Sequence, residues 1–282
     1  MFDDDVPETL RPYRKVAVIR VGRAGDGPAP DLVAVEEPLE IRLQDQPFAV
    51  IMRTPGDDKA LAAGFLLAED VIESSDDLGA VEHCRHPDQS AAHNVVNVFL
   101  RGRALEDSKR RLAERRNVVT NSSCGICGRV TIESLRTRAP VVPITWTIAK
   151  AVVAGFPATL RSRQRVFEGT GGLHAAGLFD THGVCELAAE DVGRHNAVDK
   201  VIGEMVLADR LPLGNHVLTV SGRTSFEIVQ KAWLAGVGLV CAVSAPSSLA
   251  IALAEDAGIT LLGFVRDGGF NVYTHPARLS EV

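Results

Sequence analysis

Short apolar runs alternate with polar turns in the first third of the chain, a pattern typical of β-strands. Such runs form "DLVAVEE", "PLEIRLQ" and "PFAVIMR" between residues 31 and 53, and the polar pair Asp45-Gln46 predicts a hairpin between the last two. The segment before about residue 30 includes "RAGDGPAP", whose glycines and prolines break regular structure. We therefore expect a loosely ordered segment over residues 1–30, followed by a β-rich part.

A helical pattern follows these strands. Apolar residues recur at helical spacing in "KALAAGFLLAEDVI", and Asp57 and Asp58 favour the first turn of a helix there. The run "HNVVNVFLRG" then predicts another strand, and the charged run "LEDSKRRLAERRN" predicts an exposed helix. We therefore expect a smaller, β-rich N-terminal part over residues 31–118.

The pattern changes beyond residue 183, where strands and helices alternate. The strand-like runs are "GVCELAA", "HVLTVSG", "GLVCAVSA" and "ITLLGFV", separated by helical stretches at 194–208, 224–236 and 247–257. This alternation predicts an α/β domain over residues 119–282, built on a mainly parallel sheet with flanking helices. Small or polar segments follow the strands, and they would meet at the carboxyl edge of the sheet, where open α/β folds bind ligands.

The strand exits carry features that suit an anion. Helices beginning near Ser225 and Ser247 would offer backbone N–H groups and the positive end of a helix dipole. Arg194, Arg223 and Arg266 lie at successive exits, and guanidinium groups bind diphosphates bidentately. Each arginine alone is as well explained by a salt bridge, but their shared position favours an anionic ligand.

Two histidines are candidates for proton transfer or for structural hydrogen bonds. The glycine-rich "FEGTGGLHAAGLF", residues 167–179, holds His174, which could exchange a proton near a reacting sulfur or serve only as a structural group. His195 and Asp199 are four residues apart on a predicted helix, a spacing that predicts a local hydrogen-bonded pair.

Composition narrows the function classes. The chain has 282 residues, 46% of them hydrophobic, and a formal net charge of −6, which argues against nucleic acid or an acidic membrane surface as the main partner. No apolar run reaches about 18 residues and the N-terminus does not resemble a signal peptide, so we expect a cytoplasmic protein. Five cysteines without an export signal fit reduced thiols, and Cys185 and Cys241 lie in apolar runs typical of buried positions.

The segment "TNSSCGICGRV", residues 120–130, places Cys124 and Cys127 in a C-x-x-C motif. Such a pair can form part of a zinc site, with Cys84 and His86 as the other possible ligands, or it can exchange disulfides. It can also carry sulfur as a persulfide, because a thiolate at a flexible, glycine-flanked turn can reach both a donor and an acceptor. The residues favour sulfur transfer and leave all three chemistries open.

Five motifs together resemble one family. "NSSCGICG", "FEGTGGLHAAGLF", "EDVGRHNAVDKVIG", "SGRTSFEIVQKAWLAGV" and "GFVRDGGFNVYTHP" are similar to the formate dehydrogenase accessory sulfurtransferases, the FdhD family. The resemblance runs from about residue 30 to the C-terminus. It implies a cytidine-deaminase-like α/β fold, a homodimer, a cysteine desulfurase as sulfur donor and formate dehydrogenase as target. The sulfur acceptor would be molybdenum bis(molybdopterin guanine dinucleotide).

The resemblance also implies site residues. Cys124 corresponds to the persulfide cysteine and Cys127 to its companion, and the cofactor-contacting stretch is Phe264, Val265, Arg266, Asp267, Gly268 and Gly269. From the strand exits and the glycine-rich segment we add Ser221, Arg223, His174 and Arg194 as candidate cofactor-binding residues, with GDP or GTP as a fragment ligand and no structural metal. A zinc deaminase would need H-x-E and P-C-x-x-C, whereas the chain has no H-x-E and Ser123 precedes Cys124. The alternative function is a chaperone that inserts the cofactor without covalent sulfur transfer.

Overall fold

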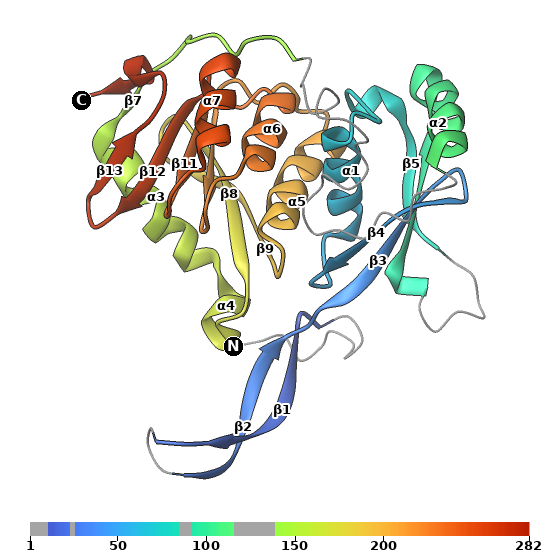
Figure 1. Ribbon diagram of the computed structural model, residues 1–282, viewed down its shortest axis with the longest axis horizontal. Coiled ribbons are helices and arrows are strands. Elements are labelled where there is room, and N and C mark those ends of the chain that lie inside the picture. Colours follow the sequence, from blue (N-terminus) through green and yellow to red (C-terminus); the bar gives the residue numbers. More distant parts are fainter. Residues whose placement is uncertain (1–10, 23–25, 85–91, 116–138, 282) are drawn as a thin grey trace.

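The computed structural model describes residues 11–22, 26–84, 92–115 and 139–281. Two main sheets and the helices between them form the body, and a two-stranded hairpin projects from it (Figure 1). The strands are β1 (Tyr13–Arg20), β2 (Gly27–Ala34), β3 (Glu37–Leu43), β4 (Gln46–Arg53), β5 (Leu78–His83), β6 (Val95–Leu100), β7 (Ile148–Ala149), β8 (His174–Asp180), β9 (Cys185–Asp191), β10 (His216–Val220), β11 (Leu239–Ala242), β12 (Thr260–Arg266), β13 (Gly269–Val272) and β14 (Leu279–Ser280). The α-helices are α1 (Asp58–Ala68), α2 (Gly102–Arg115), α3 (Lys150–Arg163), α4 (Arg165–Thr170), α5 (Arg194–Leu207), α6 (Phe226–Leu234) and α7 (Ser248–Ala257).

The N-terminal sheet has four strands in the order β4-β3-β6-β5. The pairs β3–β4 and β5–β6 are antiparallel, whereas β3 and β6 run parallel. The predicted β3–β4 hairpin is present, and it turns at Gln44 and Asp45, which both have positive φ. The predicted helices appear as α1 and α2.

The C-terminal sheet has six strands in the order β13-β12-β11-β10-β8-β9. Only β10–β11 and β11–β12 are parallel among its neighbouring pairs, whereas β8–β9, β8–β10 and β12–β13 are antiparallel. The sheet is therefore mixed, and the prediction of a mainly parallel sheet was wrong. Short turns join β8 to β9 and β12 to β13, and such turns reverse the chain instead of allowing the longer crossover that parallel strands need.

Helices cover both faces of the six-stranded sheet. Apolar side chains of α3, including Phe156 and Leu160, pack in one cluster with Phe179 and Leu262 of the sheet. Side chains of α5, α6 and α7 pack in a second cluster that also contains residues of β3, β4, β6 and α1. The two main sheets therefore share one core. The predicted boundary at residues 118 and 119 lies outside the described residues.

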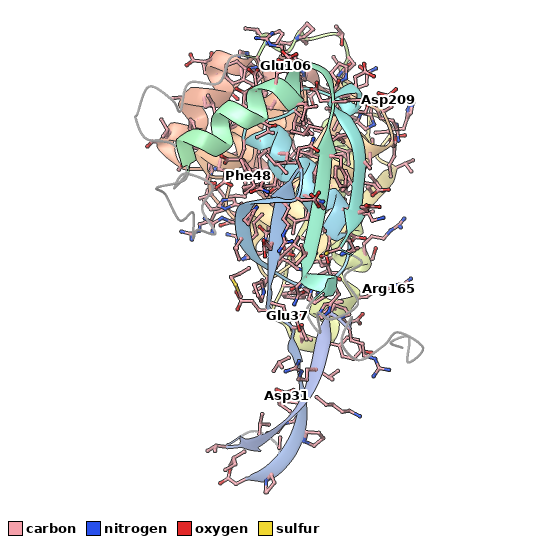
Figure 2. The ribbon with its side chains drawn as sticks, turned by 90° about the vertical axis from the view of Figure 1, so that its right-hand side faces the viewer. Asp31, Glu37, Phe48, Glu106, Arg165 and Asp209 are labelled. Atoms are coloured by element: carbon pink, nitrogen blue, oxygen red, sulfur yellow. The ribbon has the colours of Figure 1, made fainter. Side chains whose placement is uncertain are left out.

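The hairpin of β1 and β2 is a regular element within a stretch that the sequence predicted to be loosely ordered. Its antiparallel register runs from Tyr13 opposite Ala34 to Arg20 opposite Gly27. The ribbon extends away from both main sheets, with Asp31 on it and Glu37 at its base (Figure 2). The predicted run "DLVAVEE" covers the second half of β2, whereas β1 and the start of β2 were not predicted. Pro28 and Pro30 are tolerated there because in the described ranges β2 pairs with β1 alone and leaves its other edge unpaired.

Helices α1 and α5 lie in direct backbone contact between the two sheets (Figure 1). A Cβ atom added to Gly64 of α1 would lie 2.0 Å from the carbonyl oxygen of Asp199, and one added to Gly203 of α5 would lie 1.8 Å from that of Ala60. Both distances are far below van der Waals contact. Glycine at these two positions is what allows the helices to approach so closely.

We expect Gly203→Ala to destabilise the protein by about 3 kcal/mol or more, because α1 and α5 must separate to admit the methyl group. The matched control is Gly155→Ala in α3, where the new Cβ meets nothing within 4 Å. That change should stabilise the protein by about 0.5–1 kcal/mol, as replacing glycine in an exposed helix interior does. Urea unfolding of both variants measures the difference. Native-like stability of Gly203→Ala would contradict the close contact.

Candidate functional site

The strand exits singled out by the sequence lie at one edge of the six-stranded sheet. Strands β9, β10, β11 and β12 run in the same direction, so their carboxyl ends share this edge. Strand β8 runs the opposite way, which brings its first residue, His174, to the same place. The edge thus collects residues from segments far apart in the chain.

A cluster of basic side chains stands at the middle of this edge. His174 is half-buried, and Arg194 is the first residue of α5. Partial burial lowers the pKa of His174, and the nearby charges of Arg194 and Arg223 lower it further, while Asp191 acts in the opposite direction. The Arg194 Nε atom is buried and has no hydrogen-bond partner within the described residues. This concentration of positive charge suits an anionic ligand.

A cavity of about 490 Å³ opens beside the basic cluster. His174 belongs to both, and the cavity continues over the side of the sheet covered by α3 and α4. The Arg161 guanidinium lies 4.3 Å from the centre of the Phe167 ring at its wall. The volume is that of a site for a small organic ligand, and its lining mixes apolar with hydrogen-bonding groups. The cavity is lined by Pro157, Leu160, Arg161, Gln164, Phe167, Gly171, Gly172, Leu173, His174, Ser221 and Val243.

Ser221 is held at the end of β10. Its backbone N–H donates to the carbonyl of Ala175 and its hydroxyl accepts from the Ala175 N–H, both at 2.9 Å. The structure therefore brings Ser221, Arg194 and Arg223, predicted from the strand exits, together with His174, which was predicted from the glycine-rich segment.

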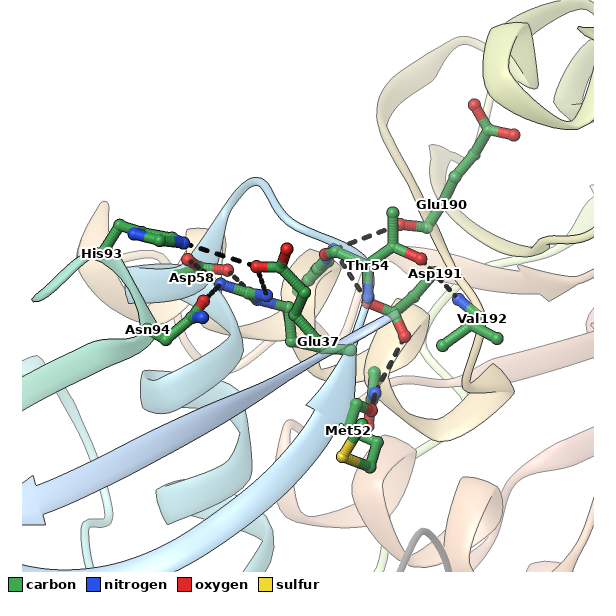
Figure 3. Close-up of polar contacts among 12 residues, drawn as sticks. Glu37, Met52, Thr54, Asp58, His93, Asn94, Glu190, Asp191 and Val192 are labelled. Atoms are coloured by element: carbon green, nitrogen blue, oxygen red, sulfur yellow. Dashed lines mark hydrogen bonds and ion pairs between the residues drawn. The ribbon is translucent and has the colours of Figure 1, made fainter. Parts of the chain in front are cut away.

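The carboxylate of Asp191 fixes the corner between β9 and α5 (Figure 3). One oxygen accepts from the Gly193 N–H and from the Asn196 side chain, both at 2.8 Å, and the other accepts from the Thr54 N–H at 3.1 Å. Lys200 adds an ion pair to the second oxygen at 2.9 Å. Because the Asp191 carboxylate is fully buried and both of its oxygens are engaged, the turn that carries Arg194 has one defined geometry.

The same corner is joined to the N-terminal sheet through the end of β4 (Figure 3). The Val192 N–H donates to the Thr54 hydroxyl, and the Asn196 amide donates to the Met52 carbonyl. Directly before Thr54, the fully buried Arg53 donates to both carboxylate oxygens of Asp58 at 2.8 and 3.0 Å. These contacts lock the β4–α1 corner against the candidate site.

His195 has partners that the sequence did not predict. Its Nε2 atom lies 3.0 Å from the Ser225 hydroxyl, and its Nδ1 atom lies 3.1 Å from a Glu227 carboxylate oxygen, in an ion-pair geometry. Asp199 instead accepts from Lys231 at 2.7 and 2.8 Å. The predicted His195–Asp199 pair is therefore replaced by two contacts to α6, because that helix packs along the face of α5 that carries both residues.

The stretch at residues 264–269 lies at the same edge and spans the end of β12, the turn at Asp267 and Gly268, and the start of β13. Phe264 and Asp267 have positive φ, and the strand register shifts between Gly263 and Arg266. The Arg266 guanidinium lies 5.8 Å from the centre of the Phe264 ring. Strand order separates this turn from Ser221 by β11, and in the described chain the cavity lining does not include the turn. Val265 is buried, whereas Arg266, Asp267, Gly268 and Gly269 are exposed.

The cysteines differ in position and burial, and Cys84 is partly exposed. Cys124 and Cys127, with His86 of the alternative zinc site, lie outside the described residues. Cys185 and Cys241 are buried, as predicted. Burial raises the pKa of the Cys185 thiol and raises that of Cys241 to about 12, so neither suits thiolate chemistry at neutral pH.

None of the helices in the described ranges has the length and hydrophobicity that a membrane span requires.

Sequence reasoning missed Asp191, Asn196 and Lys200. A signal for Asp191 was present in "EDVGRHNAVDK": an aspartate shortly before a helix often accepts a backbone N–H two residues on, as Asp191 does from Gly193. It also missed the contact of Ser225 with His195. No local spacing reveals that contact, since 30 residues separate the two.

Comparisons with known proteins agree with the motifs. The FdhD/NarQ family model matches residues 34–280. The sulfur carrier protein FdhD of Nocardia farcinica is 47% identical over 269 residues, which cover 94% of each chain. Proteins of the same name from Anaeromyxobacter dehalogenans and Sulfurisphaera tokodaii are 47% and 42% identical and cover 99% and 94% of this chain, and 98% of each relative.

A solved structure has the same fold. The crystal structure of a protein from Desulfotalea psychrophila, described as a candidate formate dehydrogenase accessory protein, has a TM-score of 0.73 and 23% identity. The likeness covers 96% of this chain and all of the other. With a family match over most of its length and relatives above 40% identity, the chain belongs to the FdhD/NarQ family.

Proposed function

We propose that this protein is a sulfur carrier that transfers persulfide sulfur from a cysteine desulfurase to the molybdenum cofactor of formate dehydrogenase. The observation that carries the proposal is the family match over residues 34–280, with relatives named as sulfur carrier protein FdhD over nearly their whole length. We further propose that it works in the cytoplasm as a homodimer.

Cys124 is the proposed sulfur-bearing residue. Its thiolate attacks the outer sulfur of the donor persulfide, a new S–S bond forms on Cys124, the donor's S–S bond breaks, and the donor leaves as a thiolate. Burial raises the pKa of Cys185 and Cys241, which leaves the C-x-x-C motif better suited to supply the thiolate than either of them. Cys127, three residues away, is placed to accept or release the sulfur during transfer.

The basic cluster is the proposed binding site for the phosphates of the sulfur acceptor, molybdenum bis(molybdopterin guanine dinucleotide). Arg194 and Arg223 supply the positive charge, and His174 and Ser221 supply hydrogen-bonding groups at the mouth of the cavity. The turn from Phe264 to Gly269 offers a ring, a guanidinium and exposed glycine backbone at the same edge, groups that can contact a guanine base. GDP and GTP should therefore bind as fragments of the acceptor.

An insertion chaperone without covalent sulfur transfer would need the cluster and the cavity but no thiol. Loading of sulfur onto the protein separates the two functions.

Incubation with a cysteine desulfurase and cysteine should add the mass of one sulfur atom to the protein, and Cys124→Ala should abolish this gain. Intact mass spectrometry with peptide mapping measures it. Cys84→Ala is the control, because it removes a partly accessible thiol outside the motif and should load normally. Full loading of Cys124→Ala, with normal activation of formate dehydrogenase, would favour the chaperone.

Cys127→Ala should load sulfur on Cys124 but pass it on more slowly, since the neighbouring thiol that assists exchange is gone. Single-turnover transfer to the cofactor gives the rate. An unchanged rate would make Cys127 a bystander.

Arg223→Ala should weaken GDP binding about tenfold, the effect of losing one charge-assisted hydrogen bond. Arg210→Ala is the matched control: it also removes one positive charge, but Arg210 follows the far end of α5 and pairs with Glu186. Titration calorimetry compares the two. Equal affinities in both variants would place the phosphates elsewhere.

A further inference from the structure

Ser225, His195 and Glu227 form a continuous chain of polar contacts at the edge of the candidate site, and we call these three residues the relay. The imidazole lies between the hydroxyl at 3.0 Å and the carboxylate at 3.1 Å. His195 and Glu227 are both 7% exposed, whereas the Ser225 end is only partly buried. The relay therefore leads from the interior toward the surface that carries Arg194 and Arg223.

The position of Ser225 is unusual for a serine that precedes a helix. Its side chain makes no hydrogen bond to the first turn of α6, whereas Ser247, in the same position before α7, accepts from the Ala250 N–H at 3.2 Å. A serine at this position normally caps its helix. The hydroxyl of Ser225 instead contacts His195.

The protonation of His195 decides what the Ser225 hydroxyl can offer a ligand. When the neutral imidazole carries its proton on Nδ1, 3.1 Å from the Glu227 carboxylate oxygen, Nε2 accepts the serine proton, so the hydroxyl can only accept from a ligand. In the imidazolium, Nε2–H donates to the serine oxygen, and the hydroxyl proton becomes free to donate outward. An anionic oxygen, which needs a donor, therefore selects the protonated form.

We propose that Ser225 binds an anionic phosphate oxygen of the ligand and that His195, acting through Ser225, couples this binding to uptake of a proton from solvent. The inference rests on the proposed function for the identity of the ligand. Glu227 holds the imidazolium that forms, and His195 is a positioning residue because it reaches the ligand only through the hydroxyl.

Charged groups around the relay affect how readily His195 takes up a proton. Glu227 favours the imidazolium, and the phosphate adds a second negative charge. Among the residues that the structure describes, the other charged groups nearby are Arg194 and Asp199 on α5, Asp191 before α5, Arg223 before α6, Lys231 on α6 and Glu69 after α1. Lys231 contacts both Asp199 and Glu227, so its charge is matched by these carboxylates.

Titration calorimetry with GDP, at one neutral pH in two buffers of different ionisation enthalpy, measures proton uptake. We expect uptake by the native protein and a smaller value in His195→Gln, which keeps a permanent N–H donor and cannot titrate. The difference is the measured quantity, because His174 can also take up a proton at this site. Ser225→Ala should bind GDP about tenfold more weakly and lose the same share of uptake. Ser247→Ala, the serine before the neighbouring helix, should match the native protein.

Equal proton uptake by the native protein and His195→Gln would overturn the relay while leaving the nucleotide site intact. Pyrophosphate resembles the diphosphate group of GDP without the guanosine, so its binding tests the relay independently of the proposed cofactor. If pyrophosphate binds with His195-dependent uptake and GDP does not bind, the guanine assignment fails and the relay stands. If neither probe binds, both proposals fail.

Discussion

The backbone contact between α1 and α5 is the constraint on which the rest of the structure depends. Gly64 and Gly203 remove the side chains that would keep the two helices apart, and the helices in turn bring the four-stranded and six-stranded sheets onto one core. Since α5 begins at the candidate site, its position against α1 also sets where Arg194 and His195 stand. The packing of α1 against α5 therefore also determines the geometry of the candidate site at the sheet edge.

Buried polar contacts then convert this packing into a defined site. Asp191 is neutralised by Lys200 and hydrogen-bonded on both oxygens, so it shapes the β9–α5 corner without offering free negative charge to an anion. Arg194 and Arg223, each three residues after the last residue of the strand before it, keep their charge near the surface. The Asp191 carboxylate is paired inside the protein, whereas the arginines face the ligand. An acidic protein can therefore have a positively charged edge on its six-stranded sheet.

The sequence did not predict α3, α4 or β8, but beyond residue 183 it predicted the order of β9, α5, β10, α6, β11, α7 and β12, because apolar runs of different period alternate there. It also predicted the gathering of Ser221, Arg223 and Arg194, since residues after parallel strands reach the same edge. It did not predict the reversed directions of β8 and β13, which depend on short turns whose geometry no hydrophobic pattern encodes. The Ser225–His195 contact and the contact of Asp191 with Thr54 escaped notice because packing brings together residues that are distant in the sequence.

The β1–β2 ribbon differs from the two main sheets in its local stability. None of its described side chains is fully buried, and within the described part of the chain no third strand pairs with it. A two-stranded ribbon of this kind has little cooperative stability of its own. Its amides should consequently exchange through local opening, at a free energy well below that of global unfolding, while the amides of β10 and β11 exchange only when the whole core opens.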